Sequence, residues 1–189
     1  MKIAIIGIGY VGLPLAVEFG KVYQTIGFDI DKRRIKDLKK GKDSTLEFSK
    51  SSLEKSSNLK YTDLENDIAE CNIYIVTVPT PIDKENKPDL TALENASRLI
   101  GKYLSYQDIV VYESTVFPGA TEEVCVPILE EVSGLEFNKD FFCGYSPERV
   151  NPGDKEHKIS MIKKIVSGST PETCEKIDNL YSSIIKAGT

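Results

Sequence analysis

Short apolar runs alternate with amphipathic stretches along the whole chain. Strands are predicted for seven runs rich in β-branched and aromatic residues, at 2–7, 24–31, 59–63, 72–81, 108–115, 141–148 and 163–169. Helices are predicted where apolar residues recur at helical spacing, at 11–22, 31–41, 64–71, 89–104, 119–134 and 170–185. Strands separated by helices pair in parallel through right-handed crossovers. The pattern therefore predicts an α/β fold, a doubly wound and mostly parallel sheet in one domain spanning residues 1–189.

Polar caps and glycines mark the ends of the predicted helices. Asp89 or Thr91 is expected to cap the helix at 89–104, and Gly134 is expected to end the helix at 119–134. Thr170 precedes Pro171, which suits the first helical position, so the last helix is expected to begin there. The stretch 42–58, rich in Ser, Lys and Glu, is expected to be an ordered excursion with a short helix.

Three glycines join the first predicted strand to the first predicted helix. Gly7, Gly9 and Gly12 form a GxGxxG pattern. Gly7 would permit a tight turn, Gly9 would let the backbone approach a pyrophosphate, and Gly12 would let the helix pack close to the strand. The helix N-terminus would offer N–H donors and a partial positive charge to the phosphates. This arrangement indicates a Rossmann-like, dinucleotide-binding sheet. The alternative is a glycine turn without a ligand.

An acid ends the second predicted strand. Asp29 lies about 20 residues after the glycines, where a carboxylate would accept hydrogen bonds from an adenosine ribose. A carboxylate there would repel a 2′-phosphate, which favours NAD over NADP. Arg33 and Arg34 leave this preference open, since a nearby arginine can accept that phosphate.

Three further loops follow predicted strands directly. The first carries Thr77 and Thr80, the second carries Ser114 and Thr115, and the third begins at about residue 144. Ligands of open α/β sheets bind beyond the carboxyl ends of the strands, and these ends share the edge that holds the glycine turn. The three loops therefore indicate a site at this edge rather than simple connections.

Composition narrows the class of protein. The net charge of −5 argues against general nucleic-acid binding. No apolar run approaches the roughly 20 residues that span a bilayer, and the N-terminal stretch lacks a signal-peptide pattern, so we expect a cytoplasmic protein without a membrane partner. Cys71, Cys125, Cys143 and Cys174 are widely spaced and His157 is the single histidine, so no metal site is expected. Cys71 and Cys143 border apolar runs and are expected in the core.

Taken together, these motifs resemble a known family. GIGYVGLPLA, Asp29, VPTP, STVFPG and YSPERVNPG are similar to the NAD-dependent nucleotide-sugar 6-dehydrogenases, the UDP-glucose/GDP-mannose dehydrogenase family, over residues 1–189. VPTPIDKENKPDLTALENA and YSPERVNPGDKEHKI resemble its UDP-N-acetylhexosamine branch most. The resemblance implies oxidation of the sugar C6 alcohol of UDP-N-acetylglucosamine or UDP-N-acetylgalactosamine to a carboxylate in two NAD-dependent steps. The product would serve capsule, Vi-type or O-antigen polysaccharide synthesis.

The resemblance also implies which residues contact the cofactor. The positions expected to contact NAD are Gly7, Gly9, Tyr10, Val11, Gly12, Asp29, Arg34, Thr80, Thr115 and Glu148. Among them, Tyr10 and Val11 would contact the pyrophosphate through their backbone. Thr80 and Thr115 would line the nicotinamide side.

Two of these residues are expected to be catalytic. Thr115 would help to hold a water molecule, and Glu148 would serve acid–base chemistry or the hydrolysis of a thioester. Arg149 and Val150 are expected to face the sugar substrate. The alternatives are a Glu148 carboxylate that binds backbone amides in a turn, and an Arg149 in a surface ion pair.

The chain departs from the family pattern in two places. Pro152 stands where some UDP-glucose enzymes carry a second glutamate, which favours the N-acetylhexosamine branch. The family's nucleophilic cysteine lies downstream in a glycine-rich motif, and none of the four cysteines has that context. We therefore expect an NAD-binding domain that is inactive alone, followed in the full enzyme by a central, homodimer-forming helix and a UDP-binding domain. The alternatives are another NAD(P)-dependent enzyme, such as a 3-hydroxyacid dehydrogenase, and a non-catalytic dinucleotide-sensing module.

Overall fold

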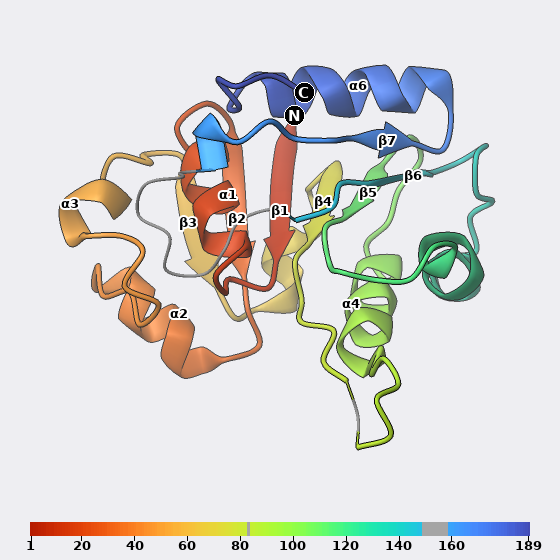
Figure 1. The fold of residues 1–189 in the computed structure, drawn as a ribbon, viewed down its shortest axis with the longest axis horizontal. Helices are drawn as coiled ribbons and strands as arrows, with labels where there is room; N and C mark the ends of the chain where they lie inside the picture. The colour runs from red at the N-terminus through yellow and green to blue at the C-terminus, as the bar shows by residue number, and fades with distance from the viewer. Residues whose placement is uncertain (83, 149–158) are drawn as a thin grey trace.

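The computed structural model describes residues 1–82, 84–148 and 159–189, which form a sheet flanked by helices (Figure 1). The strands are β1 (Lys2–Ile6), β2 (Gln24–Phe28), β3 (Leu59–Thr62), β4 (Ile73–Val76), β5 (Ile109–Tyr112), β6 (Phe142–Tyr145) and β7 (Ser167–Gly168). The helices are α1 (Gly12–Phe19), α2 (Lys32–Lys39), α3 (Lys50–Leu53), α4 (Thr91–Gly101), α5 (Val126–Ser133) and α6 (Pro171–Ser182). Single turns of other helix types form η1 (Glu65–Ile68), η2 (Thr121–Cys125) and η3 (Ile159–Met161).

The strands form one sheet in the order β3-β2-β1-β4-β5-β6-β7. Neighbouring strands are parallel from β3 to β6, which confirms the predicted doubly wound sheet. β7 is the exception, because it pairs antiparallel with β6 through Gly168 and Ser167. A parallel neighbour needs a long crossover, whereas a chain that returns from the edge where the previous strand ends pairs antiparallel. The strand predicted at 163–169 is thus reduced to two residues.

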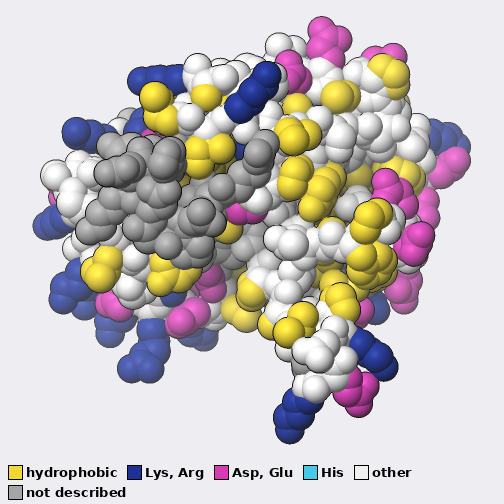
Figure 2. Space-filling view, in the orientation of Figure 1, with side chains coloured by type: hydrophobic (Ala, Val, Ile, Leu, Met, Phe, Trp, Pro, Cys, Tyr) yellow, Lys and Arg dark blue, Asp and Glu magenta, His cyan; other side chains and the backbone are white. Residues whose placement is uncertain are grey.

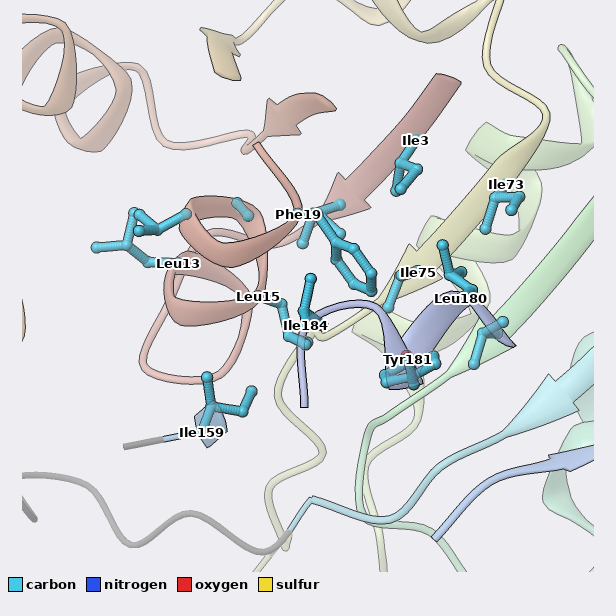
Figure 3. Close-up of a cluster of buried hydrophobic side chains, with 14 of the residues drawn as sticks. Ile3, Leu13, Leu15, Phe19, Ile73, Ile75, Ile159, Leu180, Tyr181 and Ile184 are labelled. Carbon is cyan, nitrogen blue, oxygen red and sulfur yellow. The ribbon is translucent and has the colours of Figure 1, made fainter. Parts of the chain in front are cut away.

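Two cores cover the two faces of the sheet, because successive strand side chains point to opposite faces. Ile3 and Ile5 of β1 belong to the core beneath α1 and α6, and Ala4 and Ile6 belong to the core beneath α4 and α5. In the first core, Phe19 and Tyr181 meet edge to face, with ring centroids 5.6 Å apart and planes at 82° (Figure 3). Cys71 and Cys143 lie in the second core, as predicted.

Local signals set some of the helix boundaries and not others. Thr170 caps α6 as predicted, since its hydroxyl accepts the Thr173 N–H at 3.1 Å. Thr91 does not cap α4 but is its first residue, and its N–H is accepted by Asp89 Oδ1 at 2.9 Å. The helix predicted at 64–71 is only the single 3-10 turn η1.

Candidate functional site

Backbone hydrogen bonds fix the order of the loops at the carboxyl edge of the sheet. The first residue after each of five strands donates its N–H to the last residue of the neighbouring strand, at 2.9 to 3.1 Å. These donor and acceptor pairs are Asp29 and Thr62, Gly7 and Phe28, Thr77 and Ile6, Glu113 and Val76, and Ser146 and Tyr112. The strand order reverses between β1 and β4, and such a switch point is where ligands bind in open α/β sheets. The predicted site residues therefore follow one line across this edge.

The glycine turn between β1 and α1 has the geometry that its sequence predicts. Gly7 has a φ of +95°, a conformation that side chains disfavour, and its carbonyl oxygen accepts the Thr77 hydroxyl at 2.6 Å. A Cβ on Gly12 would lie 1.9 Å from that oxygen, so only glycine lets α1 start this close to β1. A Cβ on Gly9 would meet no atom within 4 Å. Gly7 and Gly12 thus serve the fold, whereas Gly9 borders open space.

The open space beside Gly9 is where the sequence predicts the pyrophosphate of a dinucleotide. It lies at the N-terminus of α1, where Gly9 accepts the Leu13 N–H at 3.1 Å and begins the helical ladder. The first N–H groups of a helix lack intrahelical acceptors, and the helix dipole favours negative charge there. Tyr10 is exposed and Val11 is half-buried beside Gly9. Their backbone contact with the pyrophosphate remains a prediction.

Asp29 does more in the structure than its sequence position indicates. The carboxylate is half-buried, and Oδ2 accepts the Ile8 N–H at 2.8 Å while Oδ1 accepts the Asp31 N–H at 2.9 Å. Asp29 therefore braces the glycine turn from the neighbouring strand. Its contact with a ribose remains a prediction. The remaining lone pairs of the two carboxylate oxygens would accept the ribose hydroxyl groups.

We expect Asp29→Asn to weaken NAD binding by about 1–3 kcal/mol, because charge-assisted hydrogen bonds to the ribose would be lost. Titration calorimetry of the two proteins with NAD measures the difference. A melting curve serves as the control, since the bond to Ile8 also supports the turn. An unchanged NAD affinity in a folded Asp29→Asn protein would contradict the ribose assignment.

Arg34 is a buried clamp beneath the turn. Its side chain is 8% exposed; Nε donates to the Ile8 carbonyl at 2.8 Å, and Nη1 donates to Asp43 Oδ1 at 2.7 Å. Burial disfavours the charge of Asp43, but hydrogen bonds from Thr45, Arg34 and Phe48 outweigh it and lower the pKa of this carboxyl. The expected excursion at 42–58 is thus ordered: the Asp43 carboxylate binds the backbone N–H groups at 45, 47 and 48, and α3 is the short helix that was predicted. Direct contact of Arg34 with the cofactor remains a prediction.

The loops after β4 and β5 come together as predicted. The Thr80 hydroxyl donates to the Thr115 carbonyl oxygen at 2.5 Å, and the Ser114 hydroxyl donates to the Val78 carbonyl oxygen at 2.6 Å. Thr115 is exposed at the carboxyl edge. The two threonines therefore lie side by side, and their contact with the nicotinamide remains a prediction.

Glu148 adjoins a buried charged cluster that sequence reasoning missed. Lys164 Nζ lies 2.6 Å from Glu113 Oε2 and 3.4 Å from Glu148 Oε2, and the Tyr181 hydroxyl donates to Glu113 Oε1. Glu113, Lys164 and Tyr181 are at most 2% exposed. Burial raises the pKa of Glu113 to about 7, although Lys164 opposes the shift. The available signal was the position of Lys164 within the segment KKIVSGS, which the sequence predicts as a strand.

Apolar side chains are exposed in the loops that follow the strands. Tyr10, Ile30, Ile82 and Phe117 follow β1, β2, β4 and β5, with exposed fractions from 40% to 85%. Figure 2 shows hydrophobic side chains around the base of the loop between β4 and α4, which projects from the molecule at the bottom of the view. Exposed apolar groups beside polar ones suit the flat rings of a dinucleotide.

Three of the four thiols lack the character of a nucleophile. Burial raises the pKa of Cys71 to about 12 and of Cys125 to about 11, and it raises the pKa of Cys143 well above the ordinary value. Cys174 lies half-buried on α6. Arg149 and Val150, which are expected to face the sugar, fall outside the described residues, as do Pro152 and His157.

The glycine turn, the acid after β2 and the paired threonines at the switch point define a Rossmann-type dinucleotide-binding domain. Residues 1–185 match the family described as UDP-glucose/GDP-mannose dehydrogenase family, NAD binding domain. The chain belongs to this family, and the cofactor of its domain is NAD.

Relatives match the chain over its whole length. It is 61% identical over 189 residues to UDP-N-acetyl-D-glucosamine 6-dehydrogenase of Pseudomonas aeruginosa and 59% identical to the enzyme of that name from Salmonella typhi. Among solved structures, the UDP-D-ManNAc dehydrogenase of Pyrococcus horikoshii covers 100% of the chain with a TM-score of 0.92 and 33% identity. The chain spans 45%, 44% and 46% of these three proteins. Within the described part of the chain, no helix combines the length and apolar character needed to cross a membrane.

Proposed function

We propose that this chain is the NAD-binding part of a UDP-N-acetylhexosamine 6-dehydrogenase. The observation that carries the proposal is an identity of 61% and 59% over the whole chain to two proteins named UDP-N-acetyl-D-glucosamine 6-dehydrogenase. The glycine turn, the bracing acid and the paired threonines support it, because all of them lie at the carboxyl edge of the sheet, where Rossmann-type folds bind dinucleotides. In this proposal the sugar is oxidised at C6 to the uronic acid for surface polysaccharide synthesis.

Each described site residue has a defined part in this proposal. The open space at Gly9 and the N-terminus of α1 bind the pyrophosphate, and Asp29 binds the adenosine ribose. Thr80 and Thr115 line the nicotinamide side, and Thr115 orients a water. Glu148 holds or accepts a proton in the acid–base or hydrolysis step. Bound NAD would supply the hydride acceptor for the oxidation of the sugar carbon.

Other parts of the proposal concern the rest of the enzyme. Its nucleophilic cysteine and catalytic lysine lie outside these 189 residues, a view that the buried state of Cys71, Cys125 and Cys143 supports. Arg149 and Val150 would face the sugar. The full enzyme would be a cytoplasmic homodimer, joined through a central helix beyond this chain, and would bind neither nucleic acid nor membranes.

Cofactor preference gives the first test. We expect the chain to bind NAD more tightly than NADP by about tenfold or more, because Asp29 repels a 2′-phosphate. The charge of Arg34 is already paired with that of Asp43, so Arg34 offsets this repulsion poorly. The exposed Arg33 is the arginine that could still attract the 2′-phosphate. Titration calorimetry with each dinucleotide measures the ratio. A preference for NADP, or binding of neither by the folded chain, would contradict the assignment.

The substrate is tested in the full-length dehydrogenase. We expect NADH formation with UDP-N-acetylglucosamine or UDP-N-acetylgalactosamine and slower formation with UDP-glucose. The appearance of the uronic acid, followed by mass spectrometry, confirms oxidation at C6. Turnover of a 3-hydroxyacid in place of any UDP-sugar would contradict the proposal.

A further inference from the structure

The buried cluster at Lys164 joins four segments of the chain next to Glu148. Glu113 follows β5, Glu148 follows β6, Lys164 precedes β7 and Tyr181 lies on α6. The ammonium group of Lys164 also lies 6.0 Å from the centroid of the Tyr181 ring, a favourable position for a cation. Groups this far apart in sequence meet only when β5, β6, β7 and α6 are all in place.

The contacts of Lys164 converge on the backbone and side chain of the Glu148 segment. Besides the carboxylates of Glu113 and Glu148, Nζ lies 3.3 Å from the Pro147 carbonyl oxygen. The preceding residue is also held, because the Ser146 hydroxyl donates to the Ile165 carbonyl oxygen at 2.8 Å. The segment that presents Glu148 is therefore tied to the strand-like stretch around Lys164 at successive points.

Charge gives the second reason for a role at the site. An isolated buried ammonium is unfavourable, and one carboxylate partner already compensates it at 2.6 Å. The second carboxylate, Glu148, lies 3.4 Å from the same ammonium group and is only 10% exposed at its side chain. Burial raises the pKa of Glu113 to about 7. When Glu113 is protonated, the Glu148 carboxyl is the other acidic group within 4 Å of Lys164 Nζ among the described residues.

We propose that Lys164, anchored by Glu113 and Tyr181, is a positioning residue that fixes the Glu148 carboxylate at the carboxyl edge of the sheet. The proposal rests on the proposed function in one respect, the part that Glu148 takes in the reaction. Among the described residues, the titratable groups that face Glu148 are Glu113 from the end of β5, Lys164 from the approach to β7 and Tyr181 from α6.

The direct test is a carbon-13 NMR titration of the Glu148 carboxyl in the protein labelled at glutamate, with Glu148→Gln assigning the signal. We expect Lys164→Met to move the titration midpoint of Glu148 to higher pH by about one unit, because an opposite charge is removed. Lys164→Arg, which keeps the charge, is expected to leave the midpoint near that of the wild type. Lys163→Met removes an exposed neighbouring charge and is the matched control.

A second pair of variants covers the case in which Lys164→Met does not fold, since it leaves Glu113 as a buried carboxylate without its cation. Glu113→Gln alone is compared with Glu113→Gln combined with Lys164→Met, so that only the ammonium differs between two proteins without that carboxylate. The same upward shift is expected on loss of Lys164. An unchanged midpoint in either comparison, or an equal shift in Lys163→Met, overturns the proposal.

Turnover of the full-length dehydrogenase separates this inference from the proposed function. We expect the protein without Lys164 to lose about tenfold or more in kcat, and the acid limb of its pH–rate profile to move to higher pH. Its affinity for NAD is expected to stay within about threefold of the wild type. Lys164→Arg is expected to recover most of the rate. A wild-type enzyme inactive on every UDP-N-acetylhexosamine would refute the proposed function. The titration would still test whether Lys164 acts on the Glu148 carboxyl. A rate and pH profile unchanged by Lys164→Met would overturn the inference.

Discussion

Gly12→Ala is expected to lower the melting temperature of the protein by about 10 °C and to abolish measurable NAD binding. The added Cβ would lie 1.9 Å from the Gly7 carbonyl oxygen and 2.5 Å from the Thr77 hydroxyl. Both atoms are fixed, because they hydrogen-bond each other at 2.6 Å and the Gly7 turn has a left-handed φ. The helix must therefore shift away from β1, at a cost of about 3 kcal/mol or more.

Gly9→Ala is the matched control, since it introduces the same methyl group three residues earlier. No atom lies within 4 Å of the position its Cβ would take, and its φ is not left-handed. We expect this protein to melt close to the wild type but to bind NAD about tenfold or more weakly, because the methyl group occupies the space offered to the pyrophosphate. Thermal melting and calorimetry of both variants test the pair. Wild-type stability in Gly12→Ala would contradict the close packing of α1, and wild-type NAD affinity in Gly9→Ala would contradict the pyrophosphate position.

Glu148→Gln is expected to reduce kcat of the full-length dehydrogenase by about 10²- to 10⁴-fold, the range over which general acid–base groups act. The amide keeps the size of the side chain but can neither accept a proton nor hold the full charge that faces Lys164 at 3.4 Å. We expect NAD affinity to change little, because Asp29 and the glycine turn provide the other contacts. Steady-state kinetics and NAD titration together separate the two effects.

Glu175→Gln on the exposed side of α6 makes the same chemical change away from the carboxyl edge and should keep wild-type kcat. Turnover near the wild-type rate in Glu148→Gln would remove this residue from the mechanism. If Glu148→Gln lost stability as well as turnover, the carboxylate would instead have a structural role in the buried cluster.

The structural roles of the glycine turn could be predicted from the local sequence. Gly7 and Gly12 contact residues close to them in the sequence, between a strand and a helix that the hydrophobic periodicity predicts. The tight turn at Gly7 and the close helix packing at Gly12 were therefore predicted correctly. The place of Asp29 after β2 follows from the same pattern. The order of the loops then follows from parallel pairing, and it brings Thr80 and Thr115 together as expected.

Two predicted elements are shorter in the structure than the sequence indicates. Residues 64–71 have apolar spacing that suits a helix, but the structure contains only one 3-10 turn before the chain enters β4. Residues 163–169 have the composition of a strand, yet only Ser167 and Gly168 find partners at the sheet edge. Residue propensity indicates which secondary structure a segment can adopt. The packing and pairing of the segment with the rest of the protein determine how much of that secondary structure forms.

The sequence by itself determined the doubly wound sheet, the dinucleotide edge and the family, because these depend on periodicity and on motifs of adjacent residues. Only the tertiary structure decided that Arg34 clamps the turn against Asp43, and that Lys164 joins Glu113 and Glu148. Lys164 lies 51 residues from Glu113, and Tyr181 lies 68 residues from it. In a sequence a charged residue is read as solvated, and its burial and partners arise only when distant segments pack and exclude water.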